Sequence, residues 1–142
     1  MTVELIRRPA GLGEPLGRYS HVSLGQGVLV AVAGQVGLDA EGRLAGPDLT
    51  SQARQAYANL GVALAAAGCG FDDVLRMNTY LVSADLVPEF MEARAVIFSD
   101  LYPTSEYPPN TLAIVSRLVE EPLLFEVEAL AVRSVGDAAV KL

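Results

Sequence analysis

Cysteine is almost absent from this sequence: Cys69 is the only one among 142 residues. A single cysteine cannot form an intramolecular disulfide, and the lack of a CxxC motif or a Cys/His cluster argues against a structural zinc site. A chain of this length buries enough surface to fold without such crosslinks, so we expect one domain over residues 1–142. A chain that needs no disulfide suits a reducing compartment, and we expect a cytoplasmic protein.

Positive charge and long apolar runs are also scarce. Lys and Arg number 10 against 17 Asp and Glu, which gives a net charge of −7 and disfavours binding to phosphate backbones. The longest apolar runs, such as residues 28–33, fall well short of the roughly 18 residues of a membrane span. Residues 9–17 contain Pro and Gly and lack the apolar region of a signal peptide. The sequence therefore predicts no nucleic-acid partner and no membrane partner.

Apolar residues, in contrast, are abundant. They make up 51% of the chain, whereas charged residues make up only 19%. This composition is apolar for a soluble monomer, whose surface rarely carries large apolar patches. We therefore expect another subunit to cover part of the surface.

Alternating and β-branched residues predict several strands. Near the N-terminus, these are a short strand at residues 3–6 and two runs at residues 22–24 and 28–35. Gly25 and Gly27 separate the two runs and can adopt the positive φ of a tight turn, so we predict a β-hairpin there. Three further strands are predicted at residues 74–82, 111–118 and 123–132.

Apolar residues that recur every three or four positions predict two helices. The first begins after a candidate N-cap, Asp48, and ends near Gly68. The second begins near Pro88, a residue suited to the first turn, and ends before Pro103. The second helix carries Phe90, Arg94, Ile97, Phe98 and Leu101.

The order of these elements indicates the α+β class. Two amphipathic helices can cover one face of a mixed sheet, which gives a two-layered architecture. The opposite face of the sheet must then be covered, and copies of the same chain are the simplest cover.

Three stretches resemble, in order and spacing, the RidA family, also called the YjgF or YER057c family. The first is Ala33-Gly34-Gln35-Val-Gly-Leu-Asp, the second runs from Gln52 to Thr79, and the third runs from Glu126 to Arg133. Together they extend the resemblance over residues 17–133, nearly the whole chain.

The resemblance implies a chorismate-mutase-like (RidA-like) α+β fold. It also implies a homotrimer whose sheets form a central barrel, with small-molecule clefts between the subunits. The typical activity of the family is the hydrolysis of reactive enamines and imines, such as 2-aminoacrylate released by pyridoxal-phosphate enzymes, to a keto acid and ammonia. The resemblance implies neither a cofactor nor a metal.

One position departs from the family pattern at the substrate carboxylate. Family members bind this group through an arginine that opens a strand after a proline-containing loop, and Asn110 stands at that position here. An amide carries no charge, so we expect carboxylate binding to weaken about ten- to a hundred-fold, from the roughly 1.5–3 kcal/mol of a charge-assisted hydrogen bond. The substrate is therefore expected to differ. Arg18, where the family often has Pro, is a candidate to supply the missing charge.

Other positions of the implied site either match the family or are less polar. The resemblance implies that Tyr19 lines the cleft, that the amide of Gly34 contacts substrate, and that Glu126 positions the attacking water. Ala33 stands where many members have Ser, and Met91 stands where Asn is common. The pocket is therefore expected to be less polar than is usual in the family.

The residues themselves also allow a structural interpretation of the glutamates. Glu126 and Glu128 lie two positions apart on an apolar strand and so face the same side, where charge is costly unless it is paired or hydrated. An ion pair of either glutamate with Arg117 or Arg133 is an equally open alternative.

Two other reactive groups are weak candidates. Ser20 and His21 are adjacent, but no acid is placed to complete a triad with them. Cys69 follows a predicted helix C-terminus, where the helix dipole raises the pKa of a thiol, so we expect it to be inert.

Three functions follow from these observations. The first is a cofactor-independent hydrolase of an imine, an enamine or a related metabolite, with Glu126 positioning water. The second is a non-catalytic trimer that binds a small metabolite in the same clefts. The third, the ribonuclease or translation-inhibitor activity claimed for some relatives, conflicts with the acidic charge balance and with the lack of a basic aromatic patch.

Overall fold

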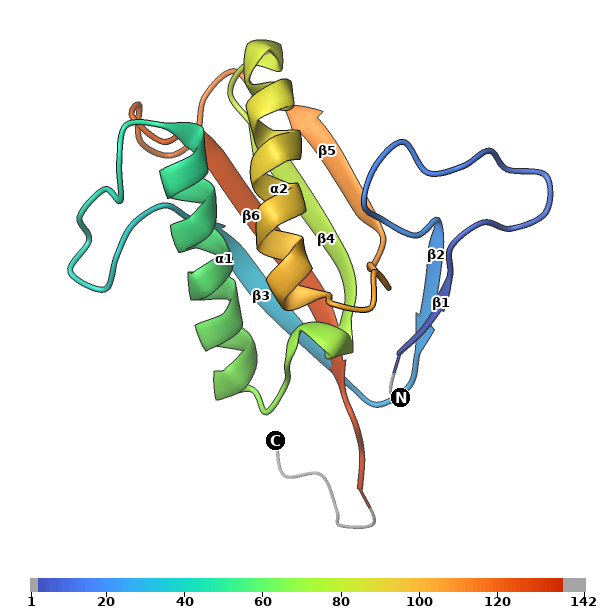
Figure 1. Cartoon of the computed structure of the whole chain (residues 1–142). Coiled ribbons are helices and arrows are strands. Elements are labelled where there is room, and N and C mark those ends of the chain that lie inside the picture. Colours follow the sequence, from blue (N-terminus) through green and yellow to red (C-terminus); the bar gives the residue numbers. More distant parts are fainter. Residues whose placement is uncertain (1–2, 137–142) are drawn as a thin grey trace.

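The computed structural model describes residues 3–136 and contains one main sheet and two helices (Figure 1). The strand order is β3 (Val28–Val36), β6 (Phe125–Arg133), β4 (Val74–Leu81) and β5 (Asn110–Ile114). Strand β6 is antiparallel to β3 and β4, whereas β4 and β5 are parallel. Helices α1 (Leu49–Ala66) and α2 (Val87–Leu101) cover one face of the sheet. The predicted two-layered α+β fold with a mixed sheet is confirmed.

Strand β6 shows how the two faces of the sheet differ. Phe125, Val127 and Ala129 are buried beneath the helices, because alternate residues of a strand point to the same side. Glu126 and Glu128 point to the opposite side and are half-buried. The sequence-based expectation that these two glutamates share a face is confirmed.

Both helices begin where local signals predicted. The carboxylate of Asp48 accepts hydrogen bonds from the backbone N–H and the hydroxyl of Ser51, each at 3.0 Å, and caps α1. Pro88 lies in the first turn of α2, which ends at Leu101, before Pro103. Two short 3-10 helices, Phe71–Asp73 and Ala84–Leu86, lead into β4 and α2.

The predicted hairpin of residues 22–24 and 28–35 is wrong. Strand β2 (Val22–Gly25) pairs with β1 (Val3–Ile6) in a separate two-stranded sheet, whereas β3 pairs with β6. Gly27 does adopt a positive φ of 147°, but a β-carbon there would overlap the backbone carbonyl of Arg133. The glycine therefore allows the close approach of β3 to β6, and it does not close a turn between β2 and β3.

The two C-terminal strands are also shorter than predicted at one end. Strand β5 ends at Ile114, and the guanidinium of Arg117 donates to the backbone carbonyls of Leu118 and Val119. These hydrogen bonds from the Arg117 side chain satisfy nearby backbone carbonyls, which therefore need no partner in a neighbouring strand. Strand β6 begins at Phe125, two residues after the predicted start.

The face of the sheet opposite the helices is open in the single chain. Leu29 and Leu130 project from it and are 66% and 41% exposed. Exposed apolar side chains on a sheet face are typical of a surface that another protein covers. None of the helices in the described part of the chain is long and apolar enough to cross a membrane.

Candidate functional site

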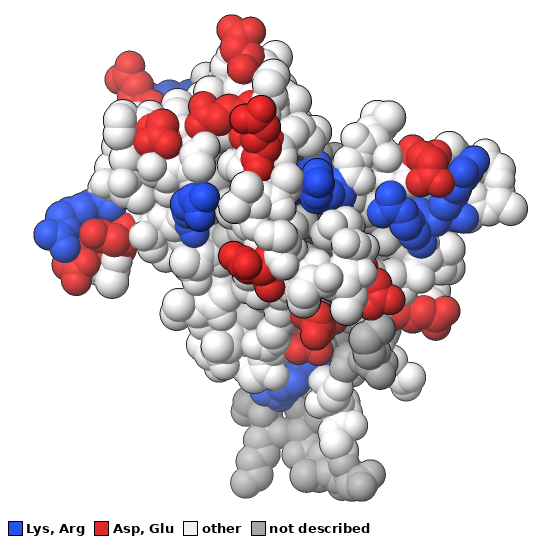
Figure 2. All heavy atoms as spheres, in the orientation of Figure 1, with Lys and Arg blue, Asp and Glu red and all other residues white. Residues whose placement is uncertain are grey.

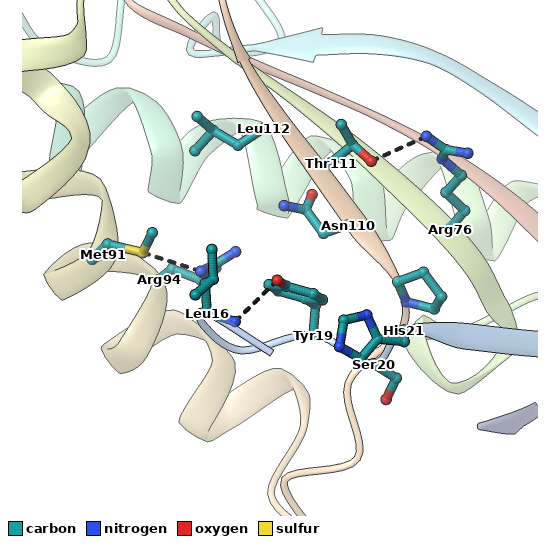
Figure 3. A pocket seen from close by; sticks show the side chains of 11 residues that line it. Leu16, Tyr19, Ser20, His21, Arg76, Met91, Arg94, Asn110, Thr111 and Leu112 are labelled. Carbon is teal, nitrogen blue, oxygen red and sulfur yellow. Dashed lines mark hydrogen bonds between the residues drawn. The ribbon is translucent and has the colours of Figure 1, made fainter. Parts of the chain in front are cut away.

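A cavity of about 490 Å³ lies between the N-terminal loop, α2 and the edge strand β5 (Figure 3). Its walls are formed by Leu16, Tyr19, Ser20, His21, Arg76, Met91, Arg94, Pro109, Asn110, Thr111 and Leu112. Three of these residues, Tyr19, Met91 and Asn110, are candidates from the sequence. The structure therefore brings together residues from positions 19, 91 and 110 of the chain.

Asn110 is held by the start of β5. Its backbone follows Pro109, whose carbonyl accepts a hydrogen bond from the N–H of Met77 at 2.9 Å. The hydroxyl of Thr79 donates to Oδ1 of Asn110 at 2.7 Å, which fixes the amide on the helix side of the sheet. Within residues 3–136, Nδ2 of Asn110 has no protein acceptor, so the side chain presents a hydrogen-bond donor to the cavity.

Tyr19 is one of the side chains that line the cavity (Figure 3). Its hydroxyl oxygen accepts a hydrogen bond from the backbone N–H of Leu16 at 3.0 Å, and its ring packs edge-on against His21 with the centroids 5.9 Å apart. These contacts hold the ring in place. The hydroxyl proton of Tyr19 remains able to donate to a ligand.

Ser20 and His21 do not form a catalytic pair. The hydroxyl of Ser20 donates to the carbonyl of Tyr107 at 2.6 Å, and Nε2 of His21 lies 2.9 Å from the carbonyl of Gly13. Each side chain therefore ties the N-terminal loop to a backbone carbonyl. The Cys69 thiol is buried, and burial raises its pKa in the direction that the helix dipole predicted.

Arg94 is a cavity residue to which sequence analysis assigned no function. Only 2% of its surface is exposed, and its guanidinium lies 4.9 Å from the centroid of the Phe90 ring. Nη2 contacts the sulfur of Met91 at 3.1 Å, whereas the buried Nε has no hydrogen-bond partner in the described chain. Burial lowers the pKa of Arg94, although a guanidinium stays protonated at neutral pH. A charged residue among the apolar positions of a helix was the signal that the sequence contained.

The other predicted site residues lie on the open face of the sheet. Strand β3 bulges between Val32 and Gln35, and a β-carbon at Gly34 would overlap the carboxylate of Glu126. Gly34 and Glu126 are therefore immediate neighbours. Ala33 lines a second cavity of about 500 Å³ on this face.

The electrostatics of the open face are set by two neighbouring carboxylates. Glu128 accepts hydrogen bonds from the amide of Asn78 at 3.1 Å and from the hydroxyl of Tyr80. Burial, followed by the charge of Glu128, raises the pKa of Glu126. Neither glutamate forms an ion pair with Arg117 or Arg133 within the described residues: those guanidinium groups bind backbone carbonyls instead.

One chain thus separates the predicted site into two groups. Tyr19, Met91 and Asn110 line the cavity at the β5 edge of the sheet, whereas Ala33, Gly34 and Glu126 lie on the open face. Arg76 lines both cavities and donates to the hydroxyl of Thr111 at 3.1 Å. Arg18 is exposed and lies outside the lining of the first cavity, so its role as a compensating charge stays a prediction.

Residues 10–133 match the protein family described as Endoribonuclease L-PSP. The chain belongs to this family. A RutC family protein of Pyrococcus horikoshii is 30% identical over 119 residues, which cover 83% of this chain and 89% of the relative. The resemblance to the RidA/YjgF proteins noted in the sequence is thereby confirmed.

Solved structures of Endoribonuclease L-PSP relatives share the fold. YyfB of Yersinia pestis, a protein of unknown function from the Rid family, is 30% identical with a TM-score of 0.83, and the match covers 94% of this chain and all of YyfB. TdcF of Escherichia coli, solved with bound serine, is 25% identical with a TM-score of 0.68, and the match covers 94% of this chain and 99% of TdcF. Among residues 3–136, no group of His, Cys, Asp and Glu side chains is arranged to hold a metal ion.

Proposed function

We propose that this protein is a small-molecule hydrolase that deaminates a reactive imine or enamine in the cavity beside Asn110. The observation that carries the proposal is the meeting of Tyr19, Met91 and Asn110 in one cavity, at the positions that the RidA resemblance implies. Family membership supports a function on small molecules, and the related TdcF has been solved with serine bound. A cytoplasmic location stays a prediction of the sequence.

The proposal includes a homotrimer, because one chain holds only half of the expected chemistry at the cavity. Glu126 lies on the open face of the sheet, and this face also carries the exposed Leu29 and Leu130. A second subunit packed against the open face covers these apolar side chains and places its cavity beside Gly34 and Glu126. The clefts between subunits that the resemblance implies have this arrangement.

The chemistry in such a cleft is simple. Water attacks the electrophilic carbon of the C=N bond while Glu126 accepts a proton from the water, which gives a carbinolamine. Glu126 returns this proton to the nitrogen, and the C–N bond breaks to release ammonia as the hydroxyl loses its proton to the departing nitrogen and becomes the carbonyl. An enamine first takes up a proton from solvent at its β-carbon and loses one from nitrogen, and so becomes the imine. Burial raises the pKa of Glu126 and so brings it closer to neutral pH, where a carboxylate is a better general base. The hydrogen-bond donors of Asn110 and Tyr19 orient the substrate.

The alternative is a non-catalytic trimer that binds a metabolite in the same cavity. The uncharged Asn110 at the position of the family arginine favours it, because the fold is kept while the anchoring charge at that position is lost. Ribonuclease activity, in contrast, has no support from the charge distribution. Figure 2 shows acidic side chains spread over the helical face and basic ones scattered among them, with no continuous basic surface there.

The test is ammonia release from 2-aminoacrylate and from imines that an amino-acid oxidase generates in situ. These compounds hydrolyse unaided, so a reaction without protein gives the baseline. We expect wild-type activity that Glu126→Ala abolishes and that Glu128→Gln, on the same face, retains to within a few-fold. An inactive wild type that Asn110→Arg activates indicates a retargeted enzyme. Inactivity of wild type, Glu126→Ala and Asn110→Arg contradicts the hydrolase and supports the binding protein.

A further inference from the structure

The guanidinium of Arg94 is a buried cation that has no acidic partner among the described residues. Its exposed fraction is 2%, and none of the ion pairs in this part of the chain involves it. The charged or ionisable groups that act on it are the cation of Arg18 and three tyrosines, Tyr19, Tyr57 and Tyr107. A buried charge without a counter-charge is costly, so a protein that keeps one generally uses it.

Contacts with the protein satisfy this cation only in part. The rings of Phe90 and Phe98, with centroids 4.9 and 6.0 Å from Cζ, offer cation–π attraction. The sulfur of Met91 is a weak acceptor for Nη2, and Nε has no hydrogen bond. Hydrogen-bonding capacity of the guanidinium thus remains unused at the wall of the cavity.

The loop above Arg94 leaves room for the guanidinium. A β-carbon at Gly17 would lie 2.6 Å from Nη2 and 3.9 Å from the sulfur of Met91. The absence of a side chain at this position therefore leaves space for the planar group, which lines the cavity together with Leu16 (Figure 3).

The remaining walls of the cavity suit an anion with a small apolar body. None of the described residues that line the cavity carries a carboxylate, whereas Asn110 and Tyr19 present hydrogen-bond donors. Leu16, Met91 and Leu112 supply apolar surface. The second arginine of the lining, Arg76, is exposed and already donates to Asn78 and Thr111. One buried cation matches a single negative charge, as on a carboxylate.

We propose that Arg94 binds the carboxylate of a small organic acid or imino acid in this cavity, with Asn110 as a second donor. The proposal rests on the proposed function only in placing the ligand in this cavity. It assigns to α2 the positive charge that position 110 at the start of β5 lacks. A guanidinium can make two parallel bonds to a carboxylate, and this geometry distinguishes it from an ammonium group.

The experiment measures the binding of four carboxylates, namely acetate, pyruvate, 2-oxobutanoate and benzoate, by calorimetry and by the shift in Tm. The uncharged amides of the same acids serve as matched ligands, and inorganic phosphate tests the other common oxyanion. We expect at least one carboxylate to bind the wild-type protein and its amide to bind about 10- to 100-fold more weakly. If no carboxylate binds, or if phosphate binds better than every carboxylate, the proposal is overturned.

Variants of Arg94 locate the binding. Arg94→Met replaces the buried charge with a shorter apolar side chain, a change that buried sites often tolerate. We expect it to lose carboxylate binding about 10- to 100-fold, and we expect Arg94→Lys to lose part of it because the paired geometry is gone. Arg54→Met, which removes an exposed arginine of α1, is the control and keeps wild-type binding. Equal carboxylate binding by Arg94→Met and the wild type overturns the proposal.

Gly17→Ala tests the same site if Arg94→Met does not fold. The new methyl group displaces the guanidinium without removing it, so carboxylate affinity falls while the circular dichroism spectrum stays that of the wild type. Unchanged carboxylate affinity in this variant counts against a role for Arg94.

The imine assay separates the two proposals. Carboxylate binding through Arg94 without imine hydrolysis refutes the hydrolase alone, whereas wild-type hydrolysis in Arg94→Met refutes the anchor alone.

Discussion

The carboxyl group of Glu126 is half-buried beside Gly34, and its titration gives a stability test. Burial and the charge of Glu128 raise its pKa. A carboxyl group whose pKa is higher in the folded than in the unfolded protein stabilises the fold fully below the unfolded-state pKa. This contribution is lost as the pH rises through the folded-state pKa. We therefore expect Glu126→Gln to become increasingly more stable than the wild type as the pH rises from about 4 to neutrality.

Urea denaturation at a fixed protein concentration and several pH values measures this difference. The control is Glu121→Gln, because Glu121 is exposed and its substitution removes one negative charge without changing a buried group. A stability difference between Glu126→Gln and the wild type that does not depend on pH would contradict the prediction.

At the same scale, the sequence identified some cavity residues and left others unassigned. Tyr19 and Asn110 followed from motif positions, and they do line one cavity. The helical periodicity placed Arg94 toward the core. Periodicity cannot show that the core opens into a cavity there, or that no acid lies nearby. Motif positions also carry no information on which face of the sheet a residue occupies. The separation of Glu126 from Asn110 could therefore be recognised only from the pairing register of the strands.

Among the secondary-structure elements, the approach of β3 to β6 depends on Gly27. Two features distinguish this glycine: its φ is 147°, and a β-carbon would overlap the carbonyl of Arg133. We expect Gly27→Ala to lower the free energy of unfolding by about 1–3 kcal/mol, the usual cost of overpacking. Gly42→Ala is the matched control, because Gly42 has a positive φ of 76° and open space around it. Chemical denaturation compares the two, and an equal loss in both contradicts a role for close approach.

The elements that the sequence predicted best are those with local causes. The cap at Asp48 and the first-turn Pro88 act within a few residues, so the helix starts could be predicted. The pairing of strands is a long-range property. The turn signal at Gly25 and Gly27 was compatible with a hairpin, but β3 instead pairs with β6, about a hundred residues away along the chain. A local pattern cannot choose between these partners.

For the whole molecule, the open sheet face and the divided site have one explanation in common. A single chain exposes Leu29 and Leu130 on the same face as Gly34 and Glu126, whereas the cavity group lies at the β5 edge of the sheet. In the proposed trimer, assembly would cover the apolar side chains and supply the missing half of the site in one step. We therefore expect a solution mass three times the 15.0 kDa of one chain. Leu130→Lys is expected to lower that mass, and Val62→Lys, on the exposed side of α1, is its control.

A divided site also predicts complementation between inactive subunits. Glu126→Ala removes the open-face group, and Arg94→Met removes the cavity anchor, so each homotrimer is expected to be inactive. When the two chains are mixed at equal amounts and reassembled, about one quarter of the clefts combine an intact cavity with an intact Glu126 from the neighbouring subunit.

Imine hydrolysis measured before and after reassembly tests this prediction. We expect activity to rise from baseline to about one quarter of the wild-type value, because only the clefts with two intact halves react. Mixing Glu126→Ala with Glu126→Gln is the control and gives no recovery, since every cleft lacks the same group. If mixed trimers form and remain inactive, each cleft draws both groups from one chain, and the site must then close by a rearrangement within the subunit.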